Sequence, residues 1–338
     1  MTMKPQAVFL GSILTLLIMV SIGYAQQDDF PTLSGPYLGQ KPPGEFPVAF
    51  APSIVSLAGA LHGCIAFTPD GKEVYWIFLP SDDGQRPPAV NYVKLVDGRW
   101  TKPGILEFSR EYGPGSLNVS PDGTKLYFSS RRPWPESWGR RPAPNSLEAF
   151  TTWVVERSGS GWGEPKPLER RINRNLTGVS STVDGTLYTH GIRRIRLENG
   201  RYTEWEELGP PLNVGRIPGG NPCISPDESY ILFNRKIPGQ YGYGIFVSYR
   251  THDDRWTEPI NLLGRIGAPR GGSQPLVTPD GKYVFYYADG KFYWMDAKII
   301  DDLKPKGLKG RESREKWDAF CFHDPAPRFY LHWARPTE

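Results

Sequence analysis

The chain has 338 residues, enough for one large domain or two small ones. Its 37 Gly, 34 Pro and 13% aromatic residues indicate many turns between aromatic-rich segments, which favours β structure and excludes disorder for most of the chain. The 40 Lys and Arg and the 36 Asp and Glu are dispersed without blocks of like charge, so we expect no nucleic-acid partner.

Residues 1–25 have the pattern of a secretory signal peptide. Lys4 precedes an apolar stretch over residues 7–22, and Gly23-Tyr24-Ala25 forms a small-x-small cleavage site. An uncleaved membrane anchor is the alternative, but polar and glycine residues interrupt the stretch and leave it short for a span. We therefore expect a periplasmic or secreted chain with no transmembrane segment after cleavage.

The cysteines and histidines give no sign of a metal site. The three cysteines are Cys64, Cys223 and Cys321, and an odd number in an exported protein leaves at least one unpaired. We expect Cys64 and Cys223 to be small buried hydrophobes. The five histidines show no HExxH spacing and the cysteines no CxxC, so the sequence predicts neither a metal nor a cofactor.

A repeated segment organises the chain. It has five copies: IAFTPDGKEVYWIF (65–78), LNVSPDGTKLYFSS (117–130), VSSTVDGTLYTH (179–190), PCISPDESYILFN (222–234) and PLVTPDGKYVFYY (275–287). Each copy is a β-prone run, a Pro-Asp-Gly turn and a second β-prone run, which predicts a β-hairpin. The turn aspartates follow one another at 52, 62, 43 and 53 residues, close to the length of one propeller blade.

The turn aspartates are predicted to be structural, because aspartate hydrogen-bonds nearby backbone amides while glycine adopts positive φ. They are Asp70, Asp122, Asp184, Asp227 and Asp280. The third copy has Val183 in place of proline, and the fourth has Glu228 in place of glycine. We expect these two turns to differ in geometry from the others.

A second repeated pattern follows four of the copies. It consists of a turn, an aromatic residue, usually a proline and an apolar end, with Trp100, Trp162, Tyr202 and Trp256 as its aromatics. We interpret it as the third strand turning into the outer strand of a blade, since edge strands tolerate proline.

The fifth copy lacks this outer strand, and residues Phe46 to Ser56 are predicted to supply it. Pairing the two ends of the chain would remove an open sheet edge. The sequence thus predicts an all-β fold, a single β-propeller over residues 46–304 with about five four-stranded blades. Six blades remain an alternative, because Arg131 to Asn145 could contain further strands. Residues 26–45 form an N-terminal arm, and residues 305–338 are expected to be a C-terminal tail packed on the propeller.

The repeat resembles the TolB-type, WD-like repeat found in the propellers of TolB, tricorn protease and prolyl oligopeptidases. The resemblance covers Phe46 to Lys304 and implies a propeller, a fold that hosts many functions. No G-x-S-x-G motif and no hydrolase domain accompany the repeats, so the peptidase function is excluded. The arm is also too short for the additional N-terminal domain of TolB.

Residues before the first strand and after the second strand of each blade would gather at one mouth of the central channel. Aligning the copies on their aspartates places His62, Ser116, Asn221 and Gln274 in the first group. The second group contains Arg131, His190, Arg235 and Tyr287. The predicted ligand-binding residues are His62, Asn221, Gln274, Arg131, His190 and Arg235. Guanidinium groups suit carboxylates or phosphates; the alternative is that these arginines lie across the blade tops or pair with surface acids.

Two functions follow as hypotheses. The first is a non-enzymatic, monomeric binding module of the cell envelope that engages a protein or a glycan. The second is a carbohydrate-active enzyme, a glycoside hydrolase or a uronate lyase, using His62, His190, Arg131 and Arg235. The first strands carry no pair of carboxylates for glycoside hydrolysis, so no catalytic residue is assigned.

Overall fold

The computed structural model describes residues 30–56, 60–80, 88–140, 143, 149–173, 177–214, 219–237, 242–268 and 271–308. The chain divides into two units, Met1–Pro31 and Thr32–Glu338. The predicted signal peptide, Cys321 and most of the predicted C-terminal tail lie outside the described residues. The account below concerns the second unit.

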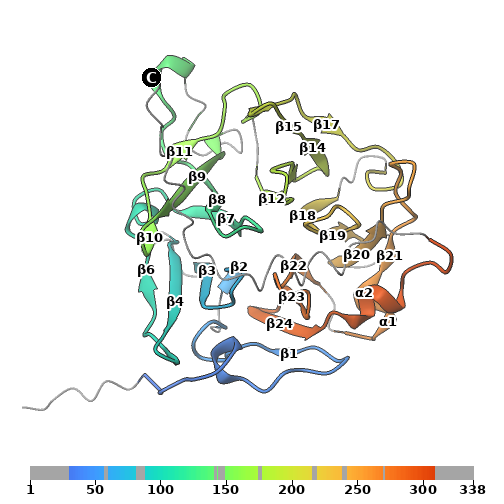
Figure 1. Cartoon of the computed structure of the whole chain (residues 1–338), viewed down its shortest axis with the longest axis horizontal. Coiled ribbons are helices and arrows are strands. Elements are labelled where there is room, and N and C mark those ends of the chain that lie inside the picture. Colours follow the sequence, from blue (N-terminus) through green and yellow to red (C-terminus); the bar gives the residue numbers. More distant parts are fainter. Residues whose placement is uncertain are drawn as a thin grey trace, which may run out of the picture. The chain divides into compact units, whose positions relative to one another are not determined.

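This unit is a β-propeller of five blades, which confirms the predicted fold (Figure 1). Blade 1 contains β2 (Ala60–Phe67), β3 (Glu73–Pro80), β4 (Val90–Val96), β5 (Arg99–Trp100) and β6 (Gly104–Ile105). Blade 2 contains β7 (Pro114–Val119), β8 (Lys125–Ser130), β9 (Thr151–Ser158), β10 (Gly161–Trp162) and β11 (Lys166–Pro167). Blade 3 contains β12 (Ser180–Ser181), β13 (Leu187–Thr189), β14 (Arg193–Ile195) and β17 (Glu206–Glu207), with the hairpin β15 (Leu197–Glu198) and β16 (Arg201–Tyr202) beside it.

The remaining two blades are simpler. Blade 4 contains β18 (Gly220–Ile224), β19 (Tyr230–Lys236), β20 (Tyr243–Tyr249) and β21 (Ile260–Asn261). Blade 5 contains β22 (Ser273–Val277), β23 (Tyr283–Ala288), β24 (Lys291–Asp296) and β1 (Val48–Ala49). The described helices are η1 (Tyr37–Gly39), η2 (Glu107–Ser109), η3 (Glu136–Trp138), α1 (Leu262–Arg265) and α2 (Lys298–Asp302). None of the described helices has the length and apolar character needed to cross a membrane.

Contacts between first strands close the ring. β2 contacts β7, β7 contacts β12, β12 contacts β18, β18 contacts β22, and β22 contacts β2. The predicted N-terminal closing strand is confirmed: Val48 pairs with Trp294 and Ala49 with Tyr293 in an antiparallel ladder. The N–H of Phe50 then donates to the carbonyl of Phe292 at 2.8 Å. The N-terminal segment therefore supplies the outer strand of the last blade.

The hydrophobic core is divided among the seams between neighbouring blades. The aromatic residue of the second repeated pattern fills one seam in each case: Trp162 packs with blades 1 and 2, Tyr202 with blades 2 and 3, and Trp256 with blades 3 and 4. Trp100 belongs to the cluster that joins blade 5 to blade 1. The pattern recurs because each seam needs a large side chain to fill it.

The five turns between first and second strands share one hydrogen bond, but the third turn is one residue shorter. Thr182 donates its N–H to the carbonyl four residues on, whereas the equivalent residue of the other copies donates to the carbonyl five residues on. The expected difference in geometry is therefore confirmed for the third turn, while the fourth keeps the backbone pattern of the remaining three. In all five copies the residue after the aspartate donates its N–H to the carbonyl three positions before, at 2.8 to 3.2 Å. Glu228 adopts φ +59°, close to the +65° of Gly71. This conformation is costly for glutamate. The Glu228 carboxylate, however, is bound by the Tyr188 hydroxyl and by Arg250, which hold it there.

Candidate functional site

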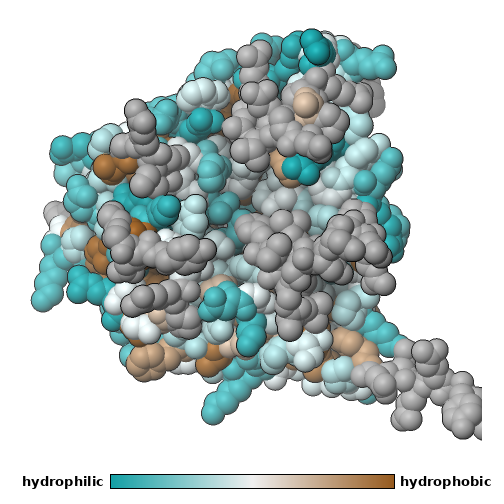
Figure 2. All heavy atoms as spheres, turned by 180° about the vertical axis from the view of Figure 1, so that it is seen from behind, coloured by the Kyte–Doolittle hydropathy of each residue, from teal (hydrophilic) through white to brown (hydrophobic). Residues whose placement is uncertain are grey.

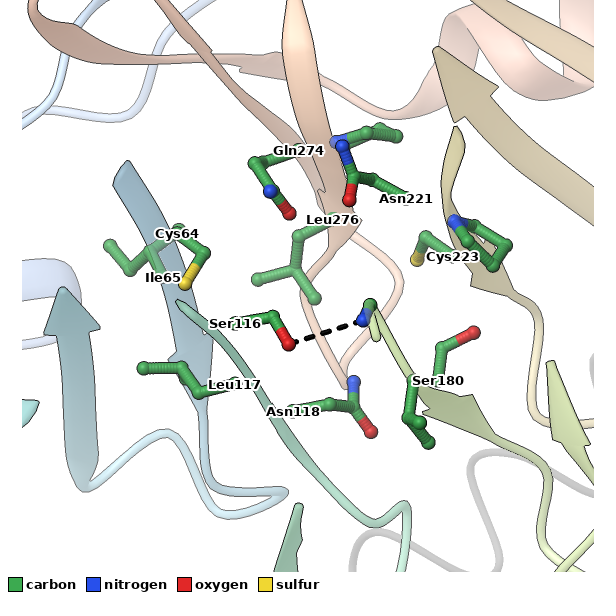
Figure 3. A pocket seen from close by; sticks show the side chains of 14 residues that line it. Cys64, Ile65, Ser116, Leu117, Asn118, Ser180, Asn221, Cys223, Gln274 and Leu276 are labelled. Carbon is green, nitrogen blue, oxygen red and sulfur yellow. Dashed lines mark hydrogen bonds between the residues drawn. The ribbon is translucent and has the colours of Figure 1, made fainter. Parts of the chain in front are cut away.

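A small cavity lies where the first strands of the five blades meet (Figure 3). Its volume is about 30 Å³, which fits one or two water molecules. Each blade contributes two or three consecutive residues to the wall. The wall consists of Cys64, Ile65, Ser116, Leu117, Asn118, Gly178, Val179, Ser180, Asn221, Pro222, Cys223, Gln274, Pro275 and Leu276.

Hydroxyl and amide groups make up the polar part of this wall. The Ser116 hydroxyl donates to Ser129 at 2.8 Å and accepts the Gly178 N–H at 3.2 Å, the dashed line of Figure 3. The Ser180 hydroxyl accepts the N–H of Ile224 at 3.1 Å. The side-chain oxygen of Asn118 is buried and has no hydrogen-bond partner among the described residues. The side-chain oxygen of Asn118 can therefore accept a hydrogen bond from a water molecule or a small polar ligand in the cavity.

The backbone around the cavity repeats an unusual conformation. Gly178, Asn221 and Gln274 each lie six positions before their turn aspartate, and their φ values are +62°, +45° and +52°. In blades 4 and 5 the strand register shifts at this point, between Gly220 and Cys223 and between Ser273 and Leu276. Such bulges re-aim side chains and are common beside binding sites. They place Asn221 and Gln274 in the wall of the cavity.

Two predicted site residues, Asn221 and Gln274, thus come together in the cavity wall, as does Ser116. The Asn221 amide donates to the side-chain oxygen of Asn234 at 3.2 Å. Arg131, His190 and Arg235 are absent from the wall. Arg131 and His190 directly follow the second strands β8 and β13, and Arg235 is the second-last residue of β19. Because neighbouring strands in a blade are antiparallel, these ends lie on the side where the first strands begin.

The two arginines are held against aromatic rings. The guanidinium of Arg131 lies 4.3 Å from the ring centroid of Phe150. That of Arg235 lies 4.7 Å from the ring of Phe246 and donates to the carbonyl of Pro211 at 3.3 Å. Burial lowers the pKa of Arg235, while Glu258 acts in the opposite direction. Both cations are therefore fixed in place by cation–π contacts.

His190 packs its ring on the backbone of blade 4. A Cβ atom placed on Gly220 would lie 2.8 Å from the imidazole Cε1, so a larger residue there would displace the ring. The His190 side chain is exposed, but its packing against blade 4 removes part of its hydration. This desolvation and the nearby Arg193 cation lower the pKa of His190. The imidazole is therefore neutral at neutral pH.

The side chain of His62 lies outside the described residues, and Cys64 is the blade 1 residue that faces the cavity at the corresponding position. Cys64 and Cys223 are free and buried, as expected. Burial raises the pKa of the Cys64 thiol to about 12 and that of Cys223 to about 11, opposed in part by backbone N–H donors. Both are uncharged thiols at neutral pH.

The five turn aspartates form local hydrogen bonds in the turns. Each accepts the N–H two residues on, at 3.0 or 3.1 Å. In four copies the Ser or Thr two residues before donates its hydroxyl to the same carboxylate. Asp280 also accepts the hydroxyl of Tyr37 at 2.8 Å, which fastens the N-terminal arm to blade 5.

The described residues contain no group of three or more His, Cys, Asp and Glu side chains that could hold a metal ion. The amides and hydroxyls of the cavity wall can form hydrogen bonds, and the cations Arg131 and Arg235 lie on the same side of the ring. The sequence pointed to Asn221 and Gln274 but missed Asn118 and Ser180. These two residues lie four positions before Asp122 and Asp184, whereas Asn221 and Gln274 lie six positions before their aspartates. Reading the alignment two positions further on would therefore have found them.

No protein-family model matches this chain, and no curated protein does either. Solved structures are similar in fold. The putative TolB from Agrobacterium tumefaciens has 17% identity over 68% of this chain and 71% of that chain, with a TM-score of 0.41. A gluconolactonase from Xanthomonas campestris has 13% identity over 78% of this chain and 97% of that chain, also with a TM-score of 0.41.

A sialidase is similar to the same degree, with 13% identity over 78% of this chain and 34% of that chain and a TM-score of 0.41. The identities and TM-scores of these structures are too low to carry an argument about the function of this chain. The assignment of a propeller rests on the pairing of the strands and the contacts that close the ring.

Proposed function

We propose that this chain is an exported, non-enzymatic binding module of the cell envelope that engages an acidic ligand, a glycan or a protein, on the mouth side of its propeller. The observation that carries the proposal is a pair of cations held on the side of the ring where the first strands begin, the same side as the cavity residues Asn221 and Gln274. Arg131 and Arg235 are stacked on Phe150 and Phe246, so little side-chain entropy is lost when they bind a carboxylate. The amides of Asn221 and Gln274 line the cavity near the beginnings of β18 and β22.

The surface of the molecule supports a polar rather than an apolar ligand. Seen from behind, the described surface is mostly hydrophilic to neutral, with hydrophobic residues in separate spots (Figure 2). The exposed large hydrophobics include Val96 on blade 1, Val183 and Trp205 on blade 3, and Tyr243 on blade 4. Dispersed residues of this kind are normal for a protein surface.

A thermal-shift screen with acidic and neutral oligosaccharides, cell-wall fragments and acidic peptides tests the proposal. We expect an acidic ligand to raise Tm, because binding to the folded state stabilises it in proportion to occupancy. Arg235→Gln should reduce the shift. Arg255→Gln is the control, since Arg255 is an exposed arginine of the same blade, paired with Asp253 in the turn at the other end of β20. No shift with any acidic ligand, or equal shifts in both variants, would contradict the proposal.

One observation favours a second candidate, a uronate lyase. A neutral imidazole is suited to act as a general base, and His190 has a lowered pKa on the side of the ring that carries Arg235. Incubation with uronate oligomers, followed by ultraviolet absorbance of an unsaturated product, tests this function. Product formed by the wild type and lost in His190→Gln would favour the lyase over the binding module.

A further inference from the structure

Blade 2 carries a long connection on the mouth side of the ring. Residues 131–150 link β8 to β9, whereas blade 5 makes the equivalent link with Asp289 and Gly290 alone. Connections of this length in a compact domain are uncommon and are often functional. In Figure 1 the green segment with the short helix η3 extends beyond the sheet of blade 2. We call residues 131–140 the tryptophan arm.

The base of the tryptophan arm is anchored to its blade. The guanidinium of Arg132 donates to the carbonyl of Phe108 at 2.6 Å and lies over the rings of Tyr112 and Trp153. Further along, the indole N–H of Trp134 donates to the carbonyl of Gly139 at 3.2 Å, which closes the arm around η3. These contacts restrict the arm, which reduces the conformational entropy that it loses on binding.

Two tryptophan rings are displayed together on the arm. The ring centroids of Trp134 and Trp138 are 6.0 Å apart with an interplanar angle of 48°, and both side chains are half-buried. Half-buried indole rings combine a large apolar face with a polar edge, which is the character of side chains that dominate binding interfaces. Pyranose rings present apolar C–H faces that can be buried against such rings.

Positive charge surrounds this tryptophan pair. Arg131 begins the arm and Arg140 ends it, and both are exposed. Arg170, also exposed, comes from the connection between blades 2 and 3, and its Nη2 atom would lie 3.7 Å from a Cβ on Gly139. None of the three arginines forms an ion pair with another described residue. Glu136 is the one acid in residues 131–140.

We propose that the tryptophan arm binds an acidic oligosaccharide, with sugar rings stacked on Trp134 and Trp138 and carboxylates paired with Arg140 and Arg170. This inference rests on the proposed function and names its ligand. The signal-like N-terminus favours a glycan over a nucleic acid as the polyanion, because an exported chain meets polysaccharides outside the cytosol. Arg131 connects the arm to the mouth, so one oligosaccharide can contact both.

Calorimetric titration of the full chain with a uronate hexasaccharide tests the inference. We expect Trp138→Ala to weaken binding about tenfold and Arg140→Gln about fivefold, while Trp138→Phe retains most of the affinity. Raising NaCl from about 50 to about 500 mM should also weaken binding, since exposed charges are screened. Trp138 is the chosen tryptophan because the indole of Trp134 forms a hydrogen bond within the arm.

Blade 3 offers matched controls. Trp205 is an exposed tryptophan whose face is covered by Arg193 at 4.4 Å, and Arg201 is an exposed arginine. Trp205→Ala and Arg201→Gln should leave the affinity within about twofold, because they lie on a different blade from the arm. Melting temperatures of all variants show whether they fold.

The outcomes distinguish a failure of the inference about the tryptophan arm from a failure of the proposed function. If Arg235→Gln abolishes binding of the uronate and Trp138→Ala leaves it unchanged, the arm inference fails and the binding module stands. Equal affinity for a neutral hexasaccharide, or tighter binding of a poly-glutamate peptide or a single-stranded oligonucleotide, would overturn the assignment to an acidic glycan. If no acidic ligand binds at all, the inference and the proposed function fail together.

Discussion

In the fourth turn, Glu228 both completes the turn and contacts a neighbouring blade. In four copies the position after the turn aspartate is glycine, which adopts positive φ without strain. In the fourth copy Glu228 adopts nearly the same φ and uses its side chain to join blades, accepting the Tyr188 hydroxyl at 2.8 Å and pairing with Arg250. The bonds to Tyr188 of blade 3 and to Arg250 of its own blade offset the strain of the turn, and the sequence of the turn alone does not reveal them.

The hydrogen bonds of Asp122 give the first prediction. Its carboxylate accepts the Ser120 hydroxyl at 2.5 Å, the Thr124 N–H at 3.0 Å and the Thr124 hydroxyl at 2.8 Å. Asp122→Ala leaves these donors unpaired and should lower the free energy of unfolding by about 1–2 kcal/mol in urea denaturation. Asp302→Ala removes only an exposed pair with Lys298 and should cost less than about 0.5 kcal/mol. Equal effects of the two substitutions would refute the role given to the turn.

At the scale of elements, the sequence predicted the parts whose signals are local. Each hairpin has its two strands and its turn within about fifteen residues, so five copies were visible without an alignment. The outer strands were harder, since proline breaks them into short pieces such as β5 and β6, which pair separately with β4. The cavity wall was only partly predicted, because register shifts at the start of β18 and β22 change which residues face the axis.

The closing strand gives a prediction at this scale. Phe50 is fully buried among Phe67, Phe285 and Trp294, so Phe50→Ala should destabilise the fold by about 3–5 kcal/mol. Phe46 lies in the same segment but is 68% exposed, and Phe46→Ala is the matched control with little expected effect. Thermal unfolding measures both. Deletion of residues 46–56 should lower Tm strongly, and an unchanged Tm would show that the ring closes without this strand.

At the scale of the whole molecule, ion pairs join neighbouring blades. Glu73 of blade 1 pairs with Arg157 of blade 2 and lies 3.0 Å from Lys94 of its own blade. At the seam between blades 3 and 4, Arg194 of blade 3 lies 3.2 Å from Asp254 of blade 4. Hydrophobic seams and partly buried ion pairs therefore hold the ring together. The repeated aromatic residues allowed the hydrophobic seams to be predicted from the sequence, but not the ion pairs.

These ion pairs make the ring sensitive to acid. Burial alone would raise the pKa of Glu73, but hydrogen bonds from Arg157, Tyr75 and Lys94 outweigh it and lower the pKa. Hydrogen bonds likewise lower the pKa of Asp122 and Asp254 against the effect of burial. A carboxylate with a lowered folded-state pKa contributes stability that is complete above its unfolded pKa, about 4, and is lost as the pH falls through the folded value.

We therefore expect Tm to stay level between about pH 5 and 8, as far as these carboxylates determine it, and to fall below about pH 4. Glu73→Gln should lower Tm at pH 7, because Arg157 loses its charged partner while remaining partly buried, and should make the decline in acid shallower. Glu107→Gln is the control: Glu107 is 77% exposed and pairs with Arg110 on the surface, so its Tm profile should follow the wild type. Parallel profiles for all three proteins would mean that the seam between blades 1 and 2 does not depend on the charge of Glu73.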